Sequence, residues 1–175
     1  EERYNADLAD GLGNLASRAL AMIEKYRAGV LPAGDSTTLD ADGLRAVAEY
    51  QRAMDALDLQ GGIATAWSHV AAANLFVQQS APWTLAKEGR DRELDAVLGA
   101  LGRALYRLAI LASPVMPTKA QALWEALGQP GDITRIPSPW YCQSWGPGRL
   151  AWPTGATVRK PAGLFPKAVS EGQNP

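Results

Sequence analysis

Cysteine and histidine are the residues that this sequence has least of. Among 175 residues there is one cysteine, Cys142, and one histidine, His69. A single cysteine excludes an internal disulfide and a cysteine-rich metal site, and it fits a reducing compartment. His69 lies off the apolar side of its segment with no second histidine or cysteine near it, so we interpret it as a surface residue. No Glu-x-x-His pair occurs either, and we predict no metal-binding residue.

An excess of charge of either sign is also missing. The sequence has 17 lysines and arginines against 18 aspartates and glutamates, which gives a net charge of −1. Proteins that bind nucleic acid through backbone phosphates alone are usually strongly basic. The charge balance therefore argues against a generic duplex-binding protein. Any RNA binding would depend on a small local site, or on a larger surface elsewhere.

Long apolar runs and common catalytic motifs are absent as well. No run of eighteen apolar residues occurs, so we predict no membrane-spanning helix and no membrane partner. No secretory signal is visible, which together with the single cysteine predicts a cytoplasmic protein. The sequence begins with Glu1 rather than methionine, which indicates that a true N-terminus is missing. It contains neither a P-loop nor a Gly-x-Ser-x-Gly motif, and we predict no catalytic residue.

What the sequence does have is helical periodicity and, at 47% hydrophobic residues, enough apolar side chains for a core. Apolar residues recur at helical spacing over five segments, which are about residues 5–27, 40–57, 63–79, 91–113 and 118–127. Asp40 fits the N-cap of the second segment, and residues 83–87 fit a short helical turn after Pro82. We therefore predict an all-α bundle of about five helices over residues 1–128.

Residues 129–175 have a different composition. Ten of the twelve prolines fall at or after Pro114, and three of the six tryptophans are Trp140, Trp145 and Trp152. Such a segment is not a regular helix, but its aromatic side chains need burial. We predict an irregular C-terminal arm, rich in proline and tryptophan, that packs on the bundle.

One helix face and one tryptophan could together bind RNA. Asn14 and Arg18 lie four residues apart, so they share a face of the first helix. Gly11 lies on the same side and would let a ligand approach the backbone closely. Trp83 follows Pro82, whose ring stiffens the chain. Amide, guanidinium and indole groups read unpaired bases by hydrogen bonding and stacking. On pattern alone, however, a solvated helix face and a core tryptophan are the more frequent interpretations.

Asn74 is a polar residue amid the apolar face of the third helix. A buried amide must find hydrogen-bond partners, because leaving it without them costs about 1–3 kcal/mol. We predict a structural role, in which Asn74 binds backbone groups near the bend at Pro82 and Trp83 and holds that loop in place.

Four runs of residues resemble the anticodon-binding domain of methionyl-tRNA synthetases. They are residues 3–18, Ala81-Pro82-Trp83, the junction formed by residues 113–117 and 123–128, and residues 155–167, which end in Leu164-Phe165-Pro166-Lys167. In that family the Asn and Arg of a Gly-Asn-Leu-x-x-Arg run contact anticodon bases, and the Trp of Ala-Pro-Trp stacks on the first anticodon base. The resemblance implies that Asn14, Arg18, Pro82 and Trp83 bind the anticodon of methionine tRNA.

The resemblance also implies that this chain is one part of a larger enzyme. The His-x-Gly-His and Lys-Met-Ser-Lys-Ser signatures of the family's nucleotide-binding fold do not occur here. The chain should therefore not activate methionine alone, and no cofactor is expected in it, because ATP and methionine would bind the missing catalytic domain. The implied partners are methionine tRNA and that catalytic domain, toward which the arm is expected to pack.

Two other hypotheses stay open. The first is a free-standing RNA-binding or regulatory protein descended from a synthetase. A genuine start codon just upstream of Glu1 would favour it, and a Lys-Met-Ser-Lys-Ser loop upstream would contradict it. The second is a structural helical bundle that docks a protein partner through its tryptophan-rich arm, which partner binding without any tRNA binding would favour.

Overall fold

Helices make up about three quarters of the described chain. The structure, a computed structural model, describes residues 2–135 and 155–159, and side chains from residue 11 onward within these ranges. Its elements are α1 (Glu2–Arg27), α2 (Thr38–Asp55), α3 (Leu59–Ser80), α4 (Pro82–Lys87), α5 (Asp91–Ala112), α6 (Pro117–Ala126) and the 3-10 turn η1 (Ile133–Arg135). No strand occurs in these ranges, and none of their helices is long and apolar enough to cross a membrane. The prediction of an all-α bundle of about five helices is confirmed, with the six-residue α4 as a short addition.

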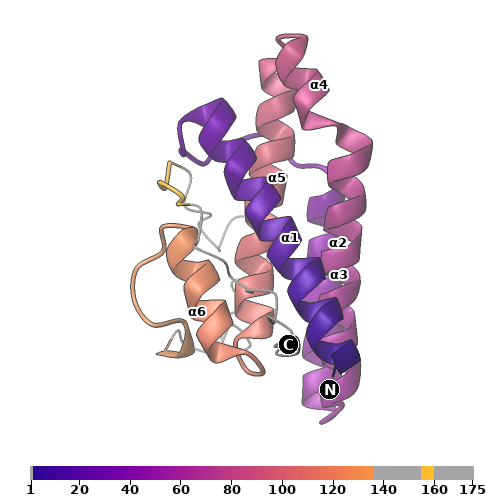
Figure 1. Cartoon of the computed structure of the whole chain (residues 1–175). Coiled ribbons are helices and arrows are strands. Elements are labelled where there is room, and N and C mark those ends of the chain that lie inside the picture. The colour runs from indigo at the N-terminus through magenta and orange to yellow at the C-terminus, as the bar shows by residue number, and fades with distance from the viewer. Residues whose placement is uncertain (1, 136–154, 160–175) are drawn as a thin grey trace, which may run out of the picture.

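The helices pack side by side around α5. Figure 1 shows α2, α3 and α5 running along the long axis of the molecule, while α1 crosses them diagonally and α6 lies against the lower half of α5. The short α4 joins α3 to α5 at the upper end. α1 and α3 both run from the lower end of the molecule toward the upper end, which matters for the site described below.

The apolar periodicity of α5 explains its central position. Leucines at positions 94, 98, 101, 105 and 108 recur every three or four residues, and all are buried. Burying one leucine side chain contributes about 1.5–3 kcal/mol, so this stripe is a large part of the hydrophobic stabilisation. On the other side of the core, α1 contributes Leu15, Leu20 and Ile23, which are also buried.

The start of α2 differs from the sequence prediction. The N-cap residue is Thr37, with an extended backbone (φ −124°), whereas Asp40 is the third residue of the helix. The Asp40 carboxylate accepts a hydrogen bond from the Thr37 backbone N–H at 2.9 Å. The prediction of Asp40 as N-cap is therefore wrong by three residues, because this acidic residue closes a capping box rather than starting the helix.

Residues 155–159, within the predicted arm, lie against the helical bundle. Thr157 forms an antiparallel bridge with Val30 in the loop after α1. The Val158 N–H donates to the Gly29 carbonyl at 2.8 Å, and the Val158 side chain is buried. Gly128, after α6, has a φ of +71°, and a Cβ on it would lie 2.4 Å from the Thr157 carbonyl oxygen. Only glycine therefore fits where this segment crosses the end of α6.

The rest of the predicted arm, residues 136–154 and 160–175, lies outside the described residues. Trp140, Trp145 and Trp152 belong to it. The proposed boundary between residues 128 and 129 stays a prediction.

Candidate nucleic-acid interface

A single residue in a left-handed conformation forms the corner between α3 and α4. Ala81 has φ +41° and ψ 61°; its N–H donates to the Val77 carbonyl at 3.2 Å, which ends α3. Its own carbonyl accepts from the Thr84 N–H at 2.8 Å, which begins α4. Pro82 takes the first position of α4, where no backbone N–H is needed.

This corner directs Trp83 outward. Pro82 is buried, and Leu85 is 7% exposed and belongs to the core. These two residues fix α4 on the bundle, whereas Trp83 is 49% exposed. A large, rigid aromatic side chain half in solvent is available as a stacking platform for a base. The interpretation of Trp83 as an ordinary core residue therefore does not hold.

Asn14 and Arg18 lie at the edge of the buried face of α1. The Asn14 side chain is exposed and Arg18 is half-buried, whereas their neighbours Leu15 and Ala19 are packed in the core. Among the described side chains, neither Asn14 nor Arg18 has a hydrogen-bond or ion-pair partner. The amide and the guanidinium are thus free to bind a ligand.

Gly11 was expected to let a ligand approach the backbone of α1, but another helix lies there. The helix that approaches its backbone is α3: a Cβ on Gly11 would lie 3.4 Å from Val70 Cγ1. The Asn74 side-chain amide donates to the Gly11 carbonyl at 3.2 Å and to the Val70 carbonyl at 3.1 Å. The expectation of a ligand beside Gly11 is wrong, since α3 occupies that space. Asn74 does bind backbone groups, but on α1 and α3 and not at the bend before Trp83.

A second group of polar residues, which sequence reasoning missed, lies between α2, α3 and α5. Arg103 donates to the Asp40 carboxylate at 2.6 and 2.8 Å, and Arg107 lies 3.4 Å from it. Burial alone would raise the pKa of Asp40. Hydrogen bonds from Arg103 and the Thr37 N–H, and the charges of both arginines, outweigh it and lower the pKa to about 2. Asp40 is therefore ionised and paired at neutral pH.

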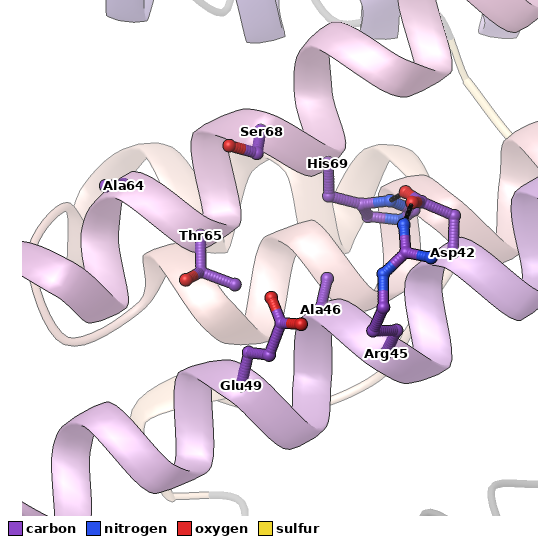
Figure 2. A pocket seen from close by; sticks show the side chains of 8 residues that line it. All are labelled: Asp42, Arg45, Ala46, Glu49, Ala64, Thr65, Ser68 and His69. Carbon is purple, nitrogen blue, oxygen red and sulfur yellow. Dashed lines mark hydrogen bonds and ion pairs between the residues drawn. The ribbon is translucent and has the colours of Figure 1, made fainter.

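His69 belongs to the same group, which corrects the prediction that it is a surface residue. Its side chain is fully buried, and Nδ1 lies 2.9 Å from a carboxylate oxygen of Asp42 (Figure 2). Nε2 is buried and finds no partner among the described residues. Burial lowers the pKa of His69, and the nearby Asp42 only partly offsets this. The histidine is thus held neutral inside the bundle, with Asp42 on Nδ1.

The cavity beside His69 is separate from the predicted RNA-binding residues. It has a volume of about 190 Å³ between α2 and α3, and Figure 2 shows Glu49, Thr65 and Ser68 on the side away from Asp42. None of Asn14, Arg18, Pro82 and Trp83 lines it. In the described part of the chain, no three histidine, cysteine, aspartate or glutamate residues are placed to hold a metal ion.

Comparison with known proteins decides the family. A family model described as the anticodon binding domain of methionyl tRNA ligase matches residues 28–174. The chain belongs to this family. Pro82 and Trp83 lie inside the matched range, and Asn14 and Arg18 precede it.

Relatives of this anticodon-binding domain extend the similarity toward the N-terminus. The chain is 40% identical to a methionine–tRNA ligase of Streptomyces coelicolor, over 94% of this chain and 32% of the relative. It is 38% identical to the enzyme of Deinococcus radiodurans, over 94% of this chain and 24% of the relative. An alignment of 94% leaves out too few residues to exclude Asn14 or Arg18. The chain spans a third or less of these relatives.

A solved structure shows the same fold in a whole enzyme. The apo form of Mycobacterium tuberculosis methionyl-tRNA synthetase superimposes with a TM-score of 0.78 at 28% sequence identity. The match covers 99% of this chain and 34% of that one. This anticodon-binding domain therefore corresponds to about one third of that synthetase.

Proposed function

We propose that this chain is the anticodon-recognising part of a methionine–tRNA ligase. It binds methionine tRNA so that a catalytic domain of the same synthetase charges it in the cytoplasm. ATP and methionine belong to that other domain. The observation that carries the proposal is the exposure of Asn14 and Trp83 and the lack of a partner for Asn14 and Arg18 among the described residues, in a member of an anticodon-binding family.

The three side chains divide the recognition between them. Trp83 stacks on an unpaired base, an interaction worth about 1–3 kcal/mol per base. Asn14 offers one donor and one acceptor group and Arg18 several donors, which suits the edges of bases that are not paired in the anticodon loop. Pro82 and Ala81 hold the indole in place. A site of this size agrees with the net charge of −1, since it does not depend on many phosphate contacts.

Aminoacylation by the full synthetase tests this assignment. Asn14→Ala and Arg18→Ala should each lower kcat/KM more for methionine tRNA than for a tRNA with an altered anticodon, because hydrogen bonds to base edges are specific. Arg52→Ala serves as the control, since Arg52 is an exposed arginine near the end of α2. Equal losses on both tRNAs would show that Arg18 only attracts phosphate, and the proposal for that residue would be wrong.

The division of labour has its own test. The purified 175-residue chain should show no methionine-dependent ATP–pyrophosphate exchange, since it lacks the nucleotide-binding signatures. Exchange by this chain, free of contaminating enzyme, would overturn the accessory role. The family assignment does not favour a free-standing regulatory protein or a purely structural bundle.

A further inference from the structure

We propose that Asn74 is a positioning residue. Its amide fixes the position of α1 along α3, and that position determines where Asn14 and Arg18 lie relative to Trp83. The inference rests on the proposed function and adds a residue that does not itself touch the RNA. It starts from the contacts of one half-buried side chain in the middle of α3.

Among the residues whose side chains the structure describes, the Asn74 amide makes the one directional contact between α1 and α3. Its Nδ2 donates to the Gly11 carbonyl of α1 at 3.2 Å and to the Val70 carbonyl of its own helix at 3.1 Å. No other hydrogen bond joins the described side chains of these two helices. The remaining contacts belong to the apolar core, to which both helices contribute. Apolar contacts tolerate sliding and rotation far better than a hydrogen bond does.

The residues that are expected to meet RNA lie on the same strip of α1 as Gly11. Successive helical residues turn by about 100°, so Asn14 and Arg18 point within about 60° and 20° of the direction of Gly11. Arg18 lies about 10 Å further along the helix, at 1.5 Å per residue. The position of Gly11 on α3 thus determines where both side chains stand.

The distance along α3 from Asn74 toward Trp83 is similar to the distance along α1 from Gly11 to Arg18. From Asn74, α3 continues to Ser80, about 9 Å further on, and the corner at Ala81 leads directly to Trp83. α1 and α3 both run toward the upper end of the molecule, although α1 crosses α3 at an angle (Figure 1), so both paths lead upward from the hydrogen bond. A slip of α1 along α3 would therefore displace Asn14 and Arg18 from Trp83 by the same amount.

A second fixed point lies at the other end of α1. Arg27 donates to Asp95 at 2.5 Å and to Asp91 at 2.8 Å, both on α5. Asn14 and Arg18 lie between the two attachments, one on α3 and one on α5. Packing alone does not require an amide at position 74, because an apolar residue of similar volume would fill the space. A polar group that fixes register at some cost in stability is a known device of helix pairs.

Two substitutions in the full synthetase separate register from stability. In Asn74→Ser the hydroxyl can still bond the Val70 carbonyl one turn back, but it is too short to reach α1. In Asn74→Leu the branched side chain keeps the same number of heavy atoms, and both bonds are lost. We expect the Leu variant to melt at the same temperature as the parent or higher. Both variants should lose anticodon discrimination on the order of tenfold, measured as the ratio of kcat/KM for methionine tRNA and for a tRNA with an altered anticodon.

The outcomes distinguish this inference from the function on which it rests. If Asn14→Ala and Trp83→Ala reduce discrimination but neither Asn74 variant does, the positioning role is wrong and the proposed function stands. If Asn14→Ala and Trp83→Ala leave discrimination unchanged, the proposed function fails. A double variant of Asn74→Ser with Asn14→Ala should lose less than the product of the single losses, since both act through one contact. Fully multiplicative losses would contradict the coupling.

Discussion

The polar side chains of two regions of this bundle differ in burial and in whether they have partners. Between α2, α3 and α5, Asp40 is buried and ion-paired with an arginine, and His69 is buried beside a carboxylate. On α1 and α4, Asn14 and Trp83 face solvent, and Asn14 has no partner among the described residues. Polar groups that are already satisfied stabilise a fold, whereas exposed groups without partners can bind something else. The comparison indicates a structural role for the first region and supports the second as the recognition surface proposed above.

The largest expected effect comes from breaking the buried region. Asp40→Ala leaves the Arg103 and Arg107 side chains, 14% and 12% exposed, without their carboxylate. Removing one partner of a buried ion pair costs about 3–5 kcal/mol of unfolding free energy. Urea denaturation of the 175-residue chain measures it. The control is Asp35→Ala, which removes an exposed pair with Arg92 and should cost less than about 1 kcal/mol. Similar losses in both variants would contradict the contrast.

The next largest effect is on function. Trp83→Ala should reduce RNA binding by the full synthetase by about 1–3 kcal/mol, the usual worth of base stacking, and leave the circular dichroism spectrum unchanged. Trp124→Ala is the matched control: Trp124 is 4% exposed, so its loss should unfold or strongly destabilise the bundle. Normal charging of methionine tRNA by the Trp83 variant would refute the stacking role.

His69 makes the stability of the buried region depend on pH. Its folded pKa is lowered from 6.5, so the unfolded chain binds the proton more tightly. The free energy of unfolding should keep the whole contribution of His69 above pH 6.5. Below that pH it should fall by up to about 1.4 kcal/mol per pH unit until the pKa of the folded state is reached. Asp40 adds a separate loss only between its ordinary pKa of 3.8 and about 2.

Unfolding free energies at pH 7 and pH 5.5 check this prediction. His69→Gln removes the titrating group and should flatten the dependence in that window while lowering overall stability. A parent chain whose stability does not change between the two values would show that His69 is not held neutral by burial.

The smallest expected effect sharpens the description of the recognition surface. Ala81 has φ +41°, a conformation that costs a residue with a Cβ about 1–2 kcal/mol. Ala81→Gly should therefore raise the unfolding free energy by about 1 kcal/mol, the remainder being lost to the flexibility of glycine in the unfolded chain. Thermal melting detects a change of this size. A lower melting temperature would mean that the Ala81 methyl group contributes packing that outweighs the strain.

Local patterns were enough to predict most of the helices. The leucine spacing of α5 placed a helix at 91–113, and the structure has it at Asp91–Ala112. The prolines and glycines between segments gave most of the boundaries within a few residues. These features depend on neighbours in sequence, which is why the fold class followed from composition and periodicity.

The residues whose surroundings were wrongly predicted have neighbours that are close in space but distant in sequence. His69 lies off the apolar stripe of α3 that faces α5, but α2 covers its other side and supplies Asp42. A helix between two neighbours buries two faces, and one periodic stripe does not reveal the second. Asp40 was taken for a cap because its partner Arg103 lies 63 positions away. The buried partner of Asn74 was foreseen, but its location on α1 was not.

The bridge between Val30 and Thr157 has a consequence for the order of assembly during synthesis. All six α-helices leave the ribosome before residues 155–159 do, so the bundle can pack while the backbone groups of Gly29 and Leu31 still lack their later partners. Residues 155–159 follow the end of α6 by about 30 residues, so at about 5–20 residues per second that interval lasts about 2–6 seconds. During it, the loop after α1 is an open edge that another extended peptide could pair with. The returning segment closes this edge, and it does so as one of the last steps in making the domain.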